Sequence, residues 1–159
     1  MKNTFVLLLA FTFLSCSDVT PRDYNEGKKD IWTIVEEKNE GMIVRIKDRY
    51  LDCDSCSAYP VRMGVAIPVI EHNTETSNLK DSIESYIEKM FAENNSGIFV
   101  AVQSGLNGEK FIEFISYAKA DNDFESIHET LKKTFPTTDV QMYAEIDPEW
   151  KVYKSFLKK

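Results

Sequence analysis

The stretch VQMYAEIDPEWKVYKSFL, residues 140–157, places a strand directly before a terminal helix and thereby decides the fold. Apolar and polar residues alternate from Val140 to Ile146, which predicts a half-buried β-strand. Asp147-Pro148 then ends the strand, because proline has no N–H to donate to a neighbouring strand. Proline is tolerated in the first turn of a helix, so we expect Asp147 to cap a short helix. The apolar side of this helix comprises Trp150, Tyr153, Phe156 and Leu157.

The composition is that of an ordinary globular protein with one core. The chain has 159 residues, of which 43% are hydrophobic and 28% charged, and this length suits a single domain. The formal net charge is −7, and the basic residues are scattered as pairs such as Lys28-Lys29. Because nucleic-acid binding requires clustered Lys and Arg, these features argue against a nucleic-acid partner.

The N-terminal residues indicate export. Lys2 is followed by an apolar run over residues 5–14, which is typical of a signal peptide and too short to span a bilayer. The segment Phe13-Leu14-Ser15-Cys16 resembles a bacterial lipobox, although an aliphatic residue is usual at the position of Phe13. This resemblance implies that Cys16 is lipidated, becomes the first mature residue and anchors the chain to a membrane of the cell envelope, facing the periplasm or the exterior.

An ordinary signal cleavage is the alternative. Ser15-Cys16-Ser17 also fits the small-x-small cleavage pattern, which would release a soluble secreted or periplasmic protein. On the lipoprotein interpretation, residues 1–15 are a signal peptide and residues 16–29 contain the lipidated cysteine and a polar tether. Residues 30–159 then form a single α+β domain.

The predicted order of elements within the domain indicates an α+β fold. The sequence predicts strands 31–37, 42–47 and 60–68, a helix capped by Ser77 or Asn78, strands 98–102 and 111–117 joined through Asn107-Gly108, a helix started by Asn122 and Glu125, and the terminal strand and helix. From Pro60 onward this order is the β-α-β-β-α-β pattern of ferredoxin-like folds, with both long helices on one face of an antiparallel sheet. An extra N-terminal hairpin precedes this unit and a short C-terminal helix follows it.

Several of these segments also carry a family resemblance. They are Trp32, Ile43-Val44-Arg45, Tyr59-Pro60, Gly108 before an aromatic strand ending in Tyr117, and Asp147-Pro148-Glu149-Trp150-Lys151-Val152-Tyr153. Together they resemble the bacterial family catalogued as domain of unknown function 695, over about residues 31–158. The family has no established activity, so the resemblance implies no catalytic residues. We therefore interpret Asp147, Pro148, Trp150 and Tyr153 as structural markers of the family.

Cys53 and Cys56 form the one local pair with metal or redox spacing. A structural zinc site normally needs four ligands, and a thioredoxin-like pair lies at the start of a helix, whereas a strand follows here. Asp52 and Asp54 further disfavour thiolates. In an exported chain, a disulfide within a short loop is the simplest interpretation, with metal binding, redox chemistry or free thiols as alternatives.

The other candidate side chains have simple structural interpretations. His128 lies on the apolar side of a helix, where we expect a half-buried structural histidine, and His72 is expected in a loop. Residues 121–125 superficially resemble a calcium loop, but Ser126 replaces the required glycine and Lys132 the required glutamate. No metal or other cofactor is expected. Four aromatic residues could form a binding surface, although aromatics at such spacing more often belong to a core: Trp32, Tyr143, Trp150 and Tyr153.

The sequence therefore favours a non-enzymatic lipoprotein of the cell envelope that binds a partner or has a structural role. Its partner would be an envelope protein or a small ligand, in addition to the membrane that holds the lipid on Cys16. The alternative is a redox or metal-binding protein that uses Cys53 and Cys56, or an enzyme whose site is assembled from distant residues.

Overall fold

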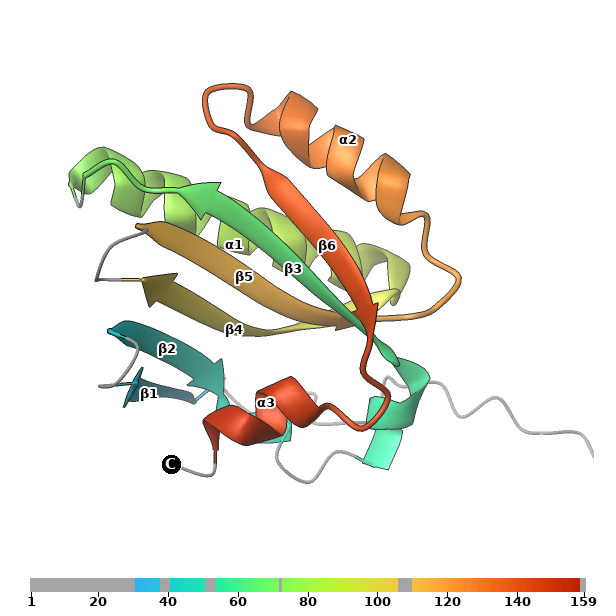
Figure 1. Ribbon diagram of the computed structural model, residues 1–159. Helices are drawn as coiled ribbons and strands as arrows, with labels where there is room; N and C mark the ends of the chain where they lie inside the picture. Colours follow the sequence, from blue (N-terminus) through green and yellow to red (C-terminus); the bar gives the residue numbers. More distant parts are fainter. Residues whose placement is uncertain (1–30, 38–40, 51–53, 72, 106–109, 158–159) are drawn as a thin grey trace, which may run out of the picture.

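The computed structural model describes residues 31–37, 41–50, 54–71, 73–105 and 110–157 (Figure 1). Its elements are β1 (Trp32–Glu37), β2 (Met42–Lys47), the 3₁₀ turns η2 (Asp48–Tyr50) and η3 (Asp54–Ala58), β3 (Val61–Pro68), α1 (Thr74–Asn94), β4 (Gly97–Gly105), β5 (Phe111–Ala118), α2 (Phe124–Thr134), β6 (Gln141–Ile146) and α3 (Lys151–Phe156). The predicted α+β class is confirmed.

The six strands form one antiparallel sheet in the order β1-β2-β4-β5-β3-β6. β3 therefore lies between β5 and β6, which both follow it in the sequence. β1 and β6 form the two edges of the sheet. The prediction of an N-terminal hairpin is confirmed by β1 and β2, which pair from Trp32 opposite Lys47 to Glu37 opposite Met42.

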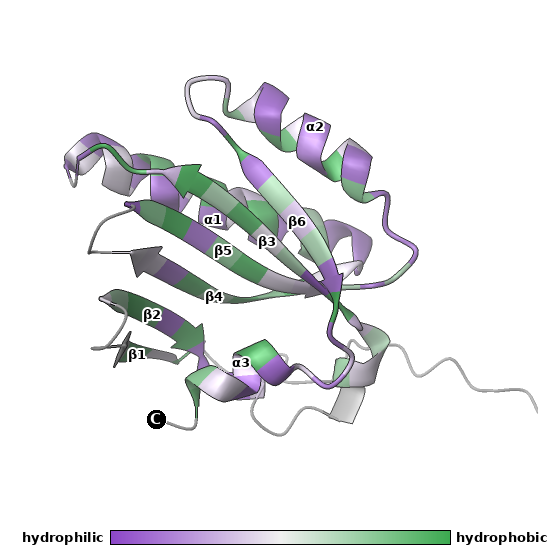
Figure 2. Cartoon of the chain, in the orientation of Figure 1, coloured by the Kyte–Doolittle hydropathy of each residue, from purple (hydrophilic) through white to green (hydrophobic). Residues whose placement is uncertain are grey.

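The first hydrophobic core lies between the sheet and the two longer helices. Ile83, Ile87 and Phe91 recur along one side of α1 and are buried against the sheet, and Leu131 of α2 is fully buried in the same cluster. Figure 2 shows α2 as alternating hydrophobic and hydrophilic bands, which is the pattern of a helix with one apolar side. Both longer helices therefore cover the same face of the sheet.

The second core lies on the opposite face and is smaller. There α3 and the turns η2 and η3 cover β2 and the adjacent parts of β4 and β5, and α3 is seen at the other side of the sheet from α2 (Figure 1). Its buried residues are Val44, Ile46, Tyr50, Tyr59, Val100, Ala101, Ile115, Tyr117, Trp150, Tyr153 and Phe156. This core uses only part of the face, and no helix or turn of the described residues covers the remainder, which we call the open face.

The predicted start of α1 is wrong by four or five residues, and that of α2 by one. α1 begins at Thr74, and Asn73 caps it through Oδ1, which accepts a hydrogen bond of 2.9 Å from the N–H of Thr76. The predicted caps Ser77 and Asn78 lie inside the helix. The first turn of α1 is polar and exposed, so the apolar periodicity by which a helix is recognised begins only after it.

The cap of the second longer helix lies one residue after the predicted one. Asp123 caps α2, because its Oδ1 accepts a hydrogen bond of 3.0 Å from the N–H of Ser126. The predicted cap Asn122 instead donates from Nδ2 to the carbonyl oxygens of Ser96 and Lys119, at 2.8 Å and 3.0 Å. Asn122 thus fastens the approach to α2 onto the turn that follows α1.

The half-buried character predicted for the last strand holds only for its start. Val140 is buried and Met142 packs against the first core, whereas Ala144 is exposed and Ile146 is 75% exposed. Because β6 is an edge strand, the core under α2 reaches only its first half.

Candidate functional site

The open part of the sheet face carries a row of polar side chains from four strands. In the ladder, Gln103 of β4 lies opposite Glu113 of β5, Glu113 opposite Ala66 of β3, and Ala66 opposite Gln141 of β6. Since opposite residues point to the same face, these positions share the side that α3 leaves uncovered. We define the open-face array as Arg62, Gln103, Glu113, Tyr143 and Glu145.

Glu113 is the centre of the open-face array. Its Oε1 accepts a hydrogen bond of 2.5 Å from the Tyr143 hydroxyl, and its Oε2 accepts one of 3.1 Å from Gln103 Nε2. Both carboxylate oxygens are thereby held by neighbours on either side. These side chains from three strands are fixed relative to one another. Binding of a ligand therefore costs less side-chain conformational entropy.

Tyr143 reaches Glu113 by crossing over β3, and Gly64 makes the crossing possible. A Cβ built on Gly64 would lie only 2.2 Å from Cε1 of the Tyr143 ring. The absence of a side chain at this position therefore leaves the space that the ring occupies. The array depends on a glycine that sits in the middle of a strand, where glycine is otherwise unfavourable.

Arg62 supplies the cation of the array. Its guanidinium carbon lies 5.0 Å from the centroid of the Tyr143 ring, and the same group forms an ion pair with Glu145. Burial on its own lowers the pKa of Arg62, but the hydrogen bond to Glu145 and the nearby Tyr143 and Glu113 outweigh this effect and raise the pKa. Arg62 thus stays positively charged throughout the physiological pH range.

Tyr143 stays protonated over the same range. Burial raises the pKa of its hydroxyl, and the hydrogen bond to Glu113 raises it further. A tyrosine in this state donates a hydrogen bond but does not serve as a base near neutral pH. The array therefore offers fixed charges and hydrogen-bonding groups.

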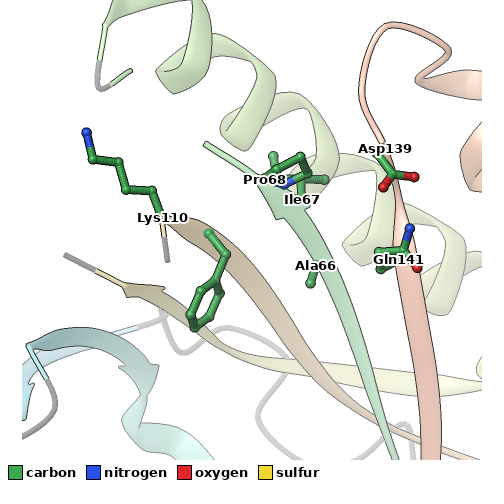
Figure 3. Close-up of a pocket in the computed structure, with 7 residues that line it drawn as sticks. Ala66, Ile67, Pro68, Lys110, Asp139 and Gln141 are labelled. Atoms are coloured by element: carbon green, nitrogen blue, oxygen red, sulfur yellow. The ribbon is translucent and has the colours of Figure 1, made fainter. Parts of the chain in front are cut away.

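A shallow depression of about 410 Å³ lies beside the array, at the end of β3 and the starts of β5 and β6. Its lining residues are Ala66, Ile67, Pro68, Lys110, Phe111, Asp139 and Gln141. Figure 3 shows Asp139 and Gln141 on one side of it, while the Lys110 side chain points away. The depression combines apolar surface with an amide and a carboxylate, and Ala66 joins it to Glu113 through the sheet ladder.

The terminal segment forms a closed network at the other end of β5. Asp147 accepts a hydrogen bond of 2.7 Å from the Tyr117 hydroxyl and further bonds from the N–H groups of Lys151 and Val152, at 2.8 Å and 3.2 Å. Burial on its own would raise the pKa of Asp147, but these hydrogen bonds outweigh it and lower the pKa. Burial and the bond to Asp147 raise the pKa of Tyr117.

Trp150 is buried at the centre of this network and precedes α3 rather than belonging to it. Its backbone adopts the left-handed conformation, with φ of 56° and ψ of 41°, which ordinary residues rarely adopt. Its Nε1 donates to the carbonyl oxygens of Tyr59 and Cys56, at 3.0 Å and 3.1 Å. The ring stacks on Tyr117 with 4.0 Å between centroids, so the strained backbone is held by packing and by hydrogen bonds.

Tyr153 completes the closed network. Its hydroxyl donates to the carbonyl oxygen of Lys47 at the end of β2, and its ring meets that of Trp150 edge to face at 5.7 Å. Pro148 lies in the turn between β6 and α3. The segment that carries the family resemblance therefore lies over a sheet face, fastened to β2, β5 and η3.

The four aromatic residues considered as one binding surface are separated in the structure. Trp150 and Tyr153 lie in the second core, whereas Tyr143 belongs to the open-face array. Trp32 packs on Phe99 on the helical side, with the Arg45 guanidinium 4.2 Å from its ring centroid. The alternative of a single aromatic surface is wrong.

The cysteines are described only in part. Cys56 lies in η3 and is disulfide-bonded. Cys16 and Cys53 fall outside the described residues, so lipidation of Cys16 and pairing of Cys53 with Cys56 stay predictions. The carbonyl oxygen of Cys56 accepts from Trp150, which connects its turn to the second core.

The histidine and acidic candidates do not assemble a site in the described residues. His128 Nε2 lies 2.9 Å from the carbonyl oxygen of Val140 and so links α2 to the start of β6. His72 is outside the described residues. Among the described residues, no group of three or more His, Cys, Asp or Glu side chains is arranged to hold a metal ion. Likewise, no described helix combines the length and apolar character that crossing a membrane requires.

The open-face array could not be recognised in the sequence because its members come from four strands. Gln103, Glu113 and Glu145 each look like an ordinary solvent-facing residue of an alternating strand. A signal was nevertheless present at Gly64, a glycine inside a strand, since such a residue often marks close approach of another group.

Comparison with known proteins gives one family. The family of unknown function DUF695 matches residues 69–158, which covers β4 to β6, both longer helices and α3. This range is shorter than the resemblance drawn from single residues and leaves out Trp32 and Tyr59-Pro60. Neither the curated proteins nor the solved structures contain a match.

Proposed function

The chain belongs to DUF695, a family of unknown function, and we propose that it is a lipid-anchored binding module of the bacterial cell envelope. In this proposal Cys16 carries the lipid, residues 17–29 form the tether, and the domain presents the open-face array and the adjoining depression to a ligand or an envelope protein. The net charge of −7 argues against a nucleic-acid partner.

The observation that carries the binding role is the fixed geometry of Glu113. A carboxylate held from both sides on an uncovered sheet face is pre-organised for contact with a partner. The array holds one guanidinium and two carboxylates, from Arg62, Glu113 and Glu145. We infer that it favours a partner with hydrogen-bond donors or a cationic group, such as an amine or amide.

The titration behaviour supports binding over acid–base catalysis. Burial raises the pKa values of Tyr117, Tyr143 and Tyr153, helped by hydrogen bonds to carboxylates at Tyr117 and Tyr143 and by the nearby Asp48 at Tyr153. Hydrogen bonds lower the pKa of Asp147. Each of these shifts moves the pKa of the group further from pH 7. A general acid or base works best when its pKa is near the operating pH, so these shifts serve structure and recognition.

The binding role is tested by mapping small-molecule fragments with NMR on isotope-labelled protein. Amine- and amide-bearing fragments should shift resonances of Glu113, Tyr143 and Gln141. Glu113→Gln should weaken these shifts, whereas the matched substitution Glu129→Gln on the exposed side of α2 should leave them unchanged. Fragments that gather elsewhere, or that bind Glu113→Gln equally well, would refute the role of the array.

The lipid anchor is tested by metabolic labelling with radioactive palmitate. Wild-type chain should incorporate label and sediment with membranes, because several acyl chains on one cysteine provide stable anchoring. Cys16→Ser should lose both properties. Equal labelling of the two chains would refute the anchor and favour the soluble secreted or periplasmic form.

A second candidate function is redox or metal chemistry at Cys53 and Cys56, or an enzyme built around them. The disulfide-bonded state of Cys56 is the observation that bears on it. Thiol titration with and without reductant, together with metal analysis, separates the two candidates. A stable disulfide without metal supports the binding module, whereas reduced, zinc-loaded cysteines would support the second candidate.

We also propose that β3 to β6 with α1 and α2 form a ferredoxin-like unit, to which β1 and β2 are added at one edge. The spatial order β4-β5-β3-β6 and the placement of both helices on one face support this topology. Such folds host many unrelated activities, so the topology alone adds nothing to the functional argument.

A further inference from the structure

The outer edge of β6, the strand that also carries Tyr143 and Glu145 of the open-face array, is a candidate interaction surface. Within the described residues, β6 pairs only with β3. The N–H of Asp147 donates to the carbonyl oxygen of Pro60 at 2.8 Å, so Pro60 and Asp147, which directly flank β3 and β6, are a hydrogen-bonded pair of opposite residues. Because hydrogen-bonded and non-hydrogen-bonded pairs alternate in antiparallel strands, Met142, Ala144 and Ile146 direct their backbone groups away from β3.

This edge lacks the usual protection against strand pairing. Protected edges carry lysine, proline, a bulge or several charges. The sequence of β6, QMYAEI, contains one charged residue and no proline, and its register with β3 is unbroken. The other edge strand, β1, ends in two consecutive glutamates. Ile146 is also 75% exposed, which leaves an apolar side chain beside an unpaired backbone.

We propose that β6 pairs antiparallel with β6 of a second copy of this chain, about a two-fold axis at Ala144. The two six-stranded sheets then become one continuous sheet. Met142 of one copy lies opposite Ile146 of the other, so the exposed Ile146 packs beside a residue of the first core. All three outward-directed residues of each strand gain hydrogen-bonded partners, and the contact is closed by its own symmetry.

The placement of charges favours this register. Glu145 of one copy faces Tyr143 of the second copy, and the Arg62 guanidinium of that copy lies 5.0 Å from the centroid of the same ring. The acid thus lies opposite an uncharged side chain of the second copy, on the side of the sheet that also carries the Arg62 guanidinium of that copy. A shift of the axis by one residue to Glu145 places two like charges opposite each other, which is destabilising.

The test uses the full chain in membranes with Ala144→Cys. Residues on the axis of an antiparallel pair lie within the distance that a disulfide spans. Under a mild oxidant, the band of a single chain should convert to one of twice the mass on a non-reducing gel. The control Glu129→Cys, exposed on α2, should stay at the mass of a single chain, and adding Ile146→Lys to Ala144→Cys should abolish the conversion.

Two results would overturn the proposal. One is conversion of Ala144→Cys no greater than that of Glu129→Cys, and the other is cross-linking of residue 144 to a different protein, which would assign the edge to an external extended peptide. If Ala144→Cys fails to accumulate, sedimentation equilibrium of the wild-type chain decides. A concentration-dependent dimer supports the proposal, and a monomer at every concentration refutes it.

Discussion

Two tyrosine–carboxylate pairs lie on the same face of the sheet and have opposite surroundings. Tyr117 donates to Asp147 at 2.7 Å beneath α3, and Tyr143 donates to Glu113 at 2.5 Å on the open face. Tyr117 is fully buried and stacked on Trp150, whereas Tyr143 is half-buried and lies beside a solvent-facing depression. The same chemical pair therefore fastens the chain at one end of β5 and is offered to a partner at the other.

The largest expected effect comes from removing the packing of the closed pair. Trp150→Ala should lower the free energy of unfolding by about 3–5 kcal/mol, because it opens a cavity in the second core and removes the indole N–H that donates to the carbonyl oxygens of Tyr59 and Cys56. Urea unfolding measures this change. Lys151→Ala, at an exposed neighbouring position, should be nearly neutral, and a fully stable Trp150→Ala would reopen a binding role for this segment.

The next effect concerns the charge of Asp147. Its lowered pKa means that Asp147 contributes stability that is fully present above the pKa of an unfolded aspartate and is lost as pH falls through the folded pKa. Asp147→Asn should cost about 1.5–3 kcal/mol at pH 7, as for a hydrogen bond to a charged group. Unfolding as a function of pH should show that the variant has lost part of the acid sensitivity of the wild type; parallel curves would contradict this account.

Removing the hydroxyl of the buried tyrosine should have a smaller effect. Tyr117→Phe keeps the stack on Trp150 but removes one of the three hydrogen bonds to the buried Asp147 carboxylate, so we expect a loss of about 1–3 kcal/mol. Chemical denaturation of the single variant and of Tyr117→Phe combined with Asp147→Asn measures the coupling. Strictly additive losses would show that the two groups do not act together.

The smallest effect is expected at the open pair. Tyr143→Phe should cost only about 0.5–1.5 kcal/mol, because solvent can replace the lost hydrogen bond of Glu113. Its binding of amine- and amide-bearing fragments should nevertheless fall, as measured by NMR. If this variant loses as much stability as Tyr117→Phe, the distinction between a structural pair and a recognition pair does not hold.

Local patterns predicted the elements of this fold well where hydrophobic periodicity and turn residues coincide. Residues 42–47 form β2 as predicted, and residues 111–117, predicted as a strand after Asn107-Gly108, form most of β5. The start of α1 was misplaced because Asn73 caps a polar first turn, which carries no apolar signal, whereas the cap of α2 is Asp123, one residue after the predicted Asn122.

The open-face array and the left-handed Trp150 could not be predicted from neighbours in the sequence. Glu113 acquires its role from Tyr143, 30 residues away, through a crossing that Gly64 permits. Trp150 was placed inside a helix by spacing alone, whereas its position is decided by carbonyl oxygens about ninety residues earlier in the chain. Both features arise from tertiary packing, which overrides local preference.

The fastening of the terminal segment has a kinetic consequence. Trp150 reaches back 91 residues to Tyr59, and Tyr153 reaches back 106 residues to Lys47. Contacts at such separation form late, since a long loop must close before they contribute. The first core contains no residue beyond Met142, whereas the second core waits for residues 150–157. Completion of folding is thereby coupled to the docking of this segment.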